Sequence, residues 1–125
     1  MSLLYFFILS HQMKSIVQKS AIPHSKLLVV KRLEELNFDP SLHQHPEYQL
    51  FLVLKGWGTR FIGDNIKPFN PGDLVFTGPN LPHLWRNDPD TKKSSKTLGI
   101  VIYFPQNFLS EIINSKEEME NIRLL

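Results

Sequence analysis

Short apolar segments separated by turn residues run through most of this chain. Each segment has four to eight residues rich in Val, Ile, Leu and Phe, and Gly, Pro, Asn and Asp recur between them. The segments are residues 27–33, 49–55, 59–63, 66–69, 73–77, 83–87 and 97–104. Short strands punctuated in this way are typical of an all-β sandwich or barrel. Because helices do not alternate with the strands, we predict an antiparallel β-barrel rather than a parallel α/β fold.

Alternation along residues 49–55 indicates which of their side chains share a face. In residues 49–55, Gln49, Phe51 and Val53 point one way, and the leucines between them point the other way. Both faces are apolar, so one face should line the barrel and the other should be covered by more protein.

Glycines mark the expected turns: Gly56 and Gly58 bracket a tight hairpin, Gly63-Asp64 forms a second one, and Pro71-Gly72 suits a type II turn.

The pattern changes after Pro105, where apolar residues recur at helical spacing. The repeat includes Phe108, Leu109, Ile112 and Ile113, with a second apolar set at Met119, Ile122 and Leu125. We therefore predict an N-terminal extension at 1–25, a barrel domain at 26–104 and a helical segment at 105–125. The pattern continues up to Leu125. We therefore expect that the chain is a fragment of a longer protein and that residues 105–125 are the start of a linker or dimerisation region. A native terminus that frays is the alternative.

Residues 3–9 are strongly apolar but too short to span a bilayer as a helix. They also lack the basic flank of a signal peptide, so no membrane association is expected. Residues 1–12, upstream of Met13, are either an extension outside the fold or an element that packs on a partner.

Composition narrows the function classes. The 125 residues carry a formal charge of only +2, and 42% hydrophobic with 21% charged residues is ordinary for one folded domain. The densest basic stretch, residues 91–96, lies among Ser and Thr and suits a solvated loop better than a nucleic-acid surface. The absence of cysteine excludes disulfides and thiolate zinc sites and is consistent with a cytoplasmic protein.

Three histidines form the main candidate site. His43 and His45 share one face of an extended segment, and His83 opens a strand beyond a turn-rich stretch. Three imidazoles suit zinc or nickel, and Gln49 is a weaker fourth ligand than a carboxylate. Alternatively, these side chains hydrogen-bond one another and a small molecule. Glu47 has the same parity, but the bend at Pro46 should turn it toward solvent.

Two aromatic residues complete the predicted pocket. Phe51 shares the face of Gln49, and Trp85 shares the face of His83 and Asn87. Trp85 either packs in the core or forms an aromatic wall against a ligand such as a sugar.

The spacing of these residues resembles the two motifs of the cupin superfamily. His43, His45 and Gly56 match the first motif, and Gly72, His83 and Asn87 match the second. Gln49 stands where the first motif has Glu, and Gly78 and Asn80 stand where the second has Pro and Gly. The resemblance covers residues 43–87 and implies a double-stranded β-helix barrel with its pocket inside.

Residues 27–125 also resemble the N-terminal, cupin-like sensor domain of AraC-family transcriptional regulators. The stretches that carry this likeness are HPEYQL, KGWGTRFIGD, PFNPGDLVFTGPNLPHLWRND and FPQNFLSEI. The resemblance implies a ligand-sensing, homodimerising domain that is not an enzyme, with a sugar or other small metabolite as effector. DNA would be bound only through a C-terminal helix-turn-helix region beyond this chain. The alternative is a stand-alone cupin enzyme, of dioxygenase or isomerase type, acting through a metal at His43, His45 and His83.

Overall fold

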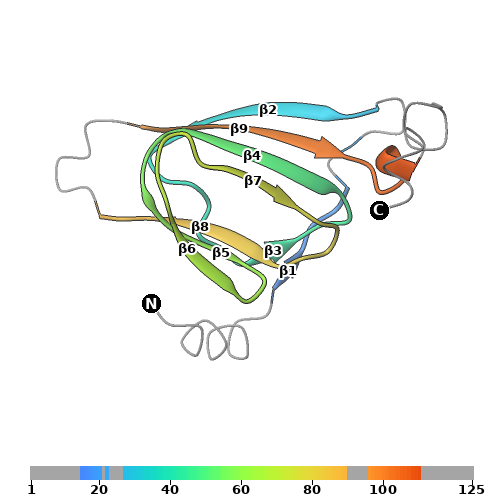
Figure 1. Ribbon diagram of the computed structural model, residues 1–125, viewed down its shortest axis with the longest axis horizontal. Helices are drawn as coiled ribbons and strands as arrows, with labels where there is room; N and C mark the ends of the chain where they lie inside the picture. Colours follow the sequence, from blue (N-terminus) through green and yellow to red (C-terminus); the bar gives the residue numbers. More distant parts are fainter. Residues whose placement is uncertain (1–14, 21, 23–26, 90–95, 111–125) are drawn as a thin grey trace, which may run out of the picture.

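Two facing β-sheets make up the protein (Figure 1). The computed structural model describes residues 15–20, 22, 27–89 and 96–110. Within these ranges the strands are β1 (Ile16–Val17), β2 (Val29–Glu35), β3 (His43–Gln44), β4 (Tyr48–Lys55), β5 (Gly58–Ile62), β6 (Asn65–Phe69), β7 (Leu74–Thr77), β8 (His83–Asn87) and β9 (Thr97–Phe104). The predicted all-β class is confirmed, and each of the seven predicted segments overlaps one of these strands.

The two sheets differ in size and share no strand. One sheet has the order β1-β3-β8-β5-β6, and the other has the order β2-β9-β4-β7. Among the described residues, the strand pairs are antiparallel except for β1 with β3, which is parallel. Strands from distant parts of the sequence are neighbours in both sheets, so residues near 45 and near 83 come together.

The core lies between the sheets and receives alternate residues of their strands. Phe51, Val53 and Val101 enter it from the four-stranded sheet, and Phe69 and Trp85 enter it from the five-stranded sheet. Full burial of such side chains stabilises a fold by about 1.5–3 kcal/mol each. The inward face predicted for β4 is confirmed, because Gln49, Phe51 and Val53 are buried.

Two of the three predicted turns are confirmed. Gly63 lies in the two-residue loop between β5 and β6 with a φ of 56°. Gly72 has a φ of 94°, and the Asp73 N–H donates to the Asn70 carbonyl oxygen at 3.0 Å, as a type II turn requires.

The predicted hairpin between Gly56 and Gly58 is wrong. β4 pairs with β7 and β9, whereas β5 pairs with β6 and β8, so the chain crosses here from one sheet to the other. Both glycines make this crossing sterically possible. Gly56 has a φ of 111°, and a Cβ atom on Gly58 would overlap the carbonyl oxygen of Arg86.

Several sequence predictions fall at the edges of the described residues. Residues 108–110 are helical, while the rest of the predicted helix, residues 1–12 and most of the basic stretch at 91–96 lie outside the described residues. Within the predicted extension at 1–25, β1 pairs with β3, and the Ile16 N–H donates to the Leu42 carbonyl oxygen at 2.9 Å. Among the described residues, no helix has the length and apolar character needed to cross a bilayer.

Candidate metal centre

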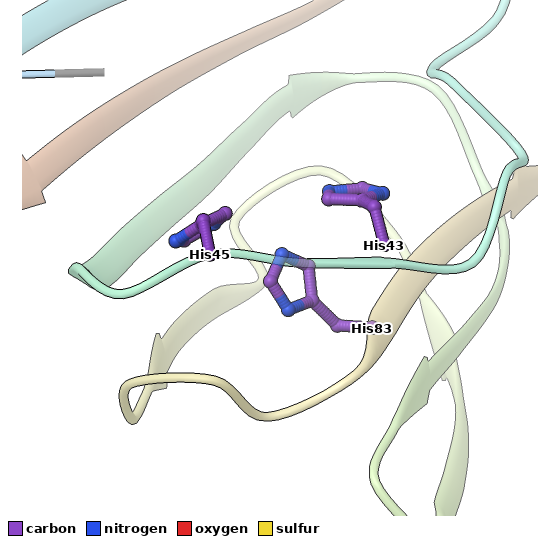
Figure 2. A group of neighbouring side chains, drawn as sticks. All are labelled: His43, His45 and His83. Atoms are coloured by element: carbon purple, nitrogen blue, oxygen red, sulfur yellow. The ribbon is translucent and has the colours of Figure 1, made fainter. Parts of the chain in front are cut away.

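Three imidazole rings meet between the segment that leads into β4 and the start of β8. His43 on β3 lies directly opposite His83 on β8, and His45 follows two residues after His43. The ligand atoms of the three side chains all lie within 4.8 Å of one another. Figure 2 shows the rings gathered around one common space. The predicted convergence of His43, His45 and His83 is therefore what the structure shows.

Backbone carbonyl groups determine the tautomers of two of these rings. Nδ1 of His43 lies 2.8 Å from the Ser41 carbonyl oxygen, and Nδ1 of His83 lies 2.7 Å from the Leu81 carbonyl oxygen. A carbonyl oxygen can only accept, so both Nδ1 atoms carry hydrogen. Each neutral ring therefore has its lone pair on Nε2, which is the atom that a metal needs.

His83 is the most enclosed of the three ligand candidates. Its side chain is only 1% exposed, and its Nε2 atom has no hydrogen-bond partner. Burial, together with the neighbouring His43, lowers the pKa of His83 to about 3, because the imidazolium form loses its hydration. His83 is therefore neutral at physiological pH. A buried lone pair without a hydrogen bond is unfavourable in proteins, and a bound cation would satisfy it.

His45 is placed by two polar side chains of its own segment. Its Nδ1 lies 3.3 Å from Oε2 of Glu47, and its Nε2 lies 3.0 Å from Oε1 of Gln49. The expectation that Glu47 turns toward solvent is wrong, since Glu47 is 2% exposed. Glu47 keeps the inward parity of the histidines through the bend at Pro46. The signal was present in the sequence as the regular i, i+2 spacing of residues 43, 45, 47 and 49.

The donor set fits a divalent transition metal. Bonds of about 2.0–2.1 Å from zinc to imidazole nitrogen place neighbouring ligands roughly 3.0–3.4 Å apart. The three histidines therefore need to move inward by less than about 1 Å each, which side-chain rotations can supply. Gln49 Oε1 already lies 3.0 Å from His45 Nε2, the separation of neighbouring ligands in a six-coordinate shell. His43, His45, His83 and Gln49 would hold the ion, which would supply Lewis acidity and open coordination positions.

Gln49 is the one ligand candidate whose charge can be changed with little change of shape. We expect Gln49→Glu to raise the affinity for Zn²⁺ or Ni²⁺ about tenfold or more, because it replaces a neutral amide oxygen with an anionic ligand. Isothermal titration of the two proteins at one pH measures the difference. Gln44→Glu is the matched control, since residue 44 has the opposite parity in the same segment. Equal affinity of the wild type and Gln49→Glu would contradict the assignment of Gln49 as a ligand.

A cavity of about 170 Å³ lies beside the histidines, between the two sheets. Leu33, Phe38, Phe51, Trp85 and Val101 provide apolar walls, and His43, Gln49 and Tyr103 provide polar groups. Four of the six predicted pocket residues thus line it, while His45 and His83 are buried nearby.

Trp85 packs in the apolar core and also lines this cavity. Its ring meets the Phe51 ring edge to face, with centroids 4.7 Å apart. A larger cavity of about 270 Å³ near Lys55, Trp57 and Asn87 contains no histidine. The smaller cavity is therefore the one that a ligand of the metal centre would enter.

Asn80 has an unusual backbone conformation in the turn before β8. Its φ is 57°, and it is the one residue other than glycine with a positive φ among the described residues. Asn tolerates this left-handed region better than other residues that carry a Cβ atom. Its N–H donates to the His45 carbonyl oxygen at 2.7 Å, so this hydrogen bond connects the turn before His83 with the segment that carries His45. Asn80 is the residue that stands in place of the Gly of the second motif, and its conformation is one that glycine adopts without strain.

We expect Asn80→Val to destabilise the fold by about 1–3 kcal/mol, because a β-branched side chain is strained at this φ. Asn80→Gly should be nearly neutral. Chemical denaturation of the three metal-free proteins measures the difference in unfolding free energy. Equal stability of Asn80→Val and the wild type would show that the turn does not require a positive φ.

Comparison with known proteins gives one family match. The model of the cupin domain matches residues 34–94, which include all three histidines. None of the curated proteins compared matches the chain in sequence.

Solved structures share the architecture at low sequence identity. An RmlC-like cupin from Shewanella frigidimarina is 18% identical over 62% of this chain and 66% of that one, with a TM-score of 0.50. A cupin 2 conserved barrel domain protein from Salinispora arenicola is 15% identical over 78% and 80%, with a TM-score of 0.54. The Fe(II) form of HppE is 20% identical over 62% and 43%, with a TM-score of 0.52.

This chain thus spans just under two thirds of the Shewanella protein and less than half of HppE. At these identities the likeness shows the fold. Together with the family match, it supports a place in the cupin superfamily, and the chain has the cupin fold, a double-stranded β-helix barrel.

Proposed function

We propose that this domain binds a small molecule inside the barrel with the help of a divalent metal held by His43, His45 and His83. One observation carries the proposal: three imidazoles converge beside a cavity, and the His83 Nε2 atom is buried without a partner. A metal there would satisfy that lone pair and retain open positions for a ligand oxygen or nitrogen.

The size and lining of the cavity support a small metabolite as the ligand. Pockets for drug-sized molecules have volumes of about 300–1,000 Å³, and this cavity has about 170 Å³. A sugar or a small ring compound could place its apolar face on Phe51 and Trp85. Its polar groups would then reach Gln49, Tyr103 or the metal.

We further propose that the domain senses this ligand for a cytoplasmic transcription regulator and does not act on it chemically. The likeness of residues 27–125 to the sensor domains of AraC-family regulators supports this role. In such a protein the barrel forms a homodimer, and DNA is recognised by a separate C-terminal domain. The isolated chain is then expected not to bind a specific operator.

A two-step experiment tests metal and ligand binding. Isothermal titration of the metal-free protein with Zn²⁺ and Ni²⁺ should give one site per chain. Native mass spectrometry of the gently purified protein should then detect a small organic molecule that is lost when the metal is chelated. A protein that binds neither ion at physiological pH would refute the metal-assisted function.

A metal-dependent cupin enzyme is the second candidate. It is favoured by the three imidazoles, which leave coordination positions open for a substrate and water. HppE, which shares the fold, is described in its Fe(II) form. Incubation of the metal-loaded protein with its co-purified ligand separates the two functions. A sensor returns the ligand unchanged, whereas an enzyme converts it.

A further inference from the structure

We propose that Glu47 is a positioning residue of the metal centre: it orients His45 through Nδ1 and supplies the negative charge that the neutral ligand set lacks. The proposal rests on the metal site proposed above. It adds to that site a residue that lies outside the ligand cluster itself.

Glu47 is buried, which is unusual for a carboxylate side chain. A carboxylate is rarely fully buried in a protein unless it is paired. Glu47 is 2% exposed, and its Oε2 lies 3.3 Å from Nδ1 of His45, whose side chain is equally enclosed. Burial and then the Glu47 carboxylate raise the pKa of Tyr103, whose ring centroid lies 5.2 Å from that of the His45 ring.

The contact determines which nitrogen of His45 can bind a metal. Nδ1 faces the Glu47 carboxylate and Nε2 lies 3.0 Å from Oε1 of Gln49, so both ring nitrogens face acceptor oxygens in the metal-free protein. A cation bound at Nε2 would take the place of the hydrogen there, and the carboxylate favours a ring that keeps its hydrogen on Nδ1. A carboxylate that accepts from the far nitrogen of a metal-binding histidine also makes the imidazole a stronger donor to the metal.

Among the three histidines, His45 is the one whose Nδ1 faces a carboxylate. His43 and His83 donate to the carbonyl oxygens of Ser41 and Leu81, which are neutral. With Gln49 in place of a carboxylate, every ligand of the candidate centre is uncharged. A divalent ion there would gain compensating charge from Glu47, one imidazole ring away.

The test is isothermal titration of the wild type, Glu47→Gln and Glu35→Gln with Zn²⁺ at one pH. Gln has nearly the same shape as Glu, so Glu47→Gln removes the charge and keeps an oxygen atom beside Nδ1. We expect a loss of affinity of about 10–100-fold, the usual effect of removing the outer partner of a metal-binding histidine. Glu35→Gln removes a carboxylate that lines the same cavity but forms no ion pair with a histidine among the described residues, and it should bind Zn²⁺ like the wild type.

Nitrogen-15 NMR of the metal-free proteins adds a readout independent of metal affinity. The wild type should show hydrogen on Nδ1 of His45, and Glu47→Ala should shift His45 toward the other tautomer. Equal affinity of Glu47→Gln and the wild type, or an unchanged His45 tautomer in Glu47→Ala, would overturn the role of Glu47. Failure of the wild type to bind zinc would instead refute the metal site, and with it this role.

Discussion

Replacement of His83 by alanine is expected to lower the affinity for Zn²⁺ or Ni²⁺ by more than about 100-fold. Loss of an outer partner of a metal ligand already costs about 10–100-fold, and His83 is proposed to bind the ion directly. It is also the ligand with the least freedom, because its Nδ1 is held by the Leu81 carbonyl oxygen and its ring is buried. Metal-assisted ligand binding should fall by a similar factor.

The variant should remain folded. Loss of the buried ring leaves a cavity, but it also removes a nitrogen atom without a hydrogen bond, so we expect a destabilisation of about 1–3 kcal/mol. Trp85→Phe is the matched control, since it changes another buried ring two residues further along β8 and should retain the metal affinity. Isothermal titration and thermal unfolding of the three proteins supply the measurements. Full metal affinity in His83→Ala would exclude His83 as a ligand.

The residues that the sequence predicted well are those whose position follows from strand alternation and register. Gln49, Phe51 and Val53 point inward because every second residue of β4 does so. His43 and His83 come together because β3 pairs with β8. In each case a local rule and the tertiary structure agree.

The wrong predictions concern sequence patterns that are compatible with two different structures. Two glycines one residue apart suit a tight hairpin, but they equally suit the crossing between sheets at Gly56 and Gly58. Similarly, a glutamate after a proline usually faces water. Glu47 is instead enclosed because His45, which comes from the same short segment, provides its partner. Sequence spacing alone does not distinguish these alternatives, since the deciding contacts are made in three dimensions.

The outer face of the four-stranded sheet is apolar on β9, β4 and β7 and at Val30 of β2. One row of cross-strand neighbours consists of Val30, Ile102, Leu50 and Phe76. The next row consists of Arg32, Ile100, Leu52 and Leu74. Leu74 is 58% exposed and Phe76 is 52% exposed, so nothing in the described part of the chain covers them fully. The second apolar face predicted for β4 therefore lies on the surface of this single copy.

A second copy of the chain is the partner that we propose for this face. Two identical apolar sheets can pack face to face, and an isologous dimer is the commonest symmetric assembly. The border of the face is also self-complementary in charge. Arg32 and Glu34 lie two residues apart on β2, with their charged groups 3.4 Å apart at the surface. In a two-fold arrangement, Arg32 of one copy can meet Glu34 of the other.

Leu74→Glu is therefore expected to convert a dimer into a monomer, because it places a charge on the apolar face of the proposed contact. An exposed position tolerates the change, so the free energy of unfolding of the monomer should shift by only about 0.5 kcal/mol. Light scattering across a dilution series measures the mass, and Leu36→Glu is the matched control at an equally exposed leucine beyond the end of β2. The wild type and Leu36→Glu should be dimers at concentrations at which Leu74→Glu is monomeric. A monomeric wild type at every concentration, or a dimeric Leu74→Glu, would show that this face does not bind a second copy.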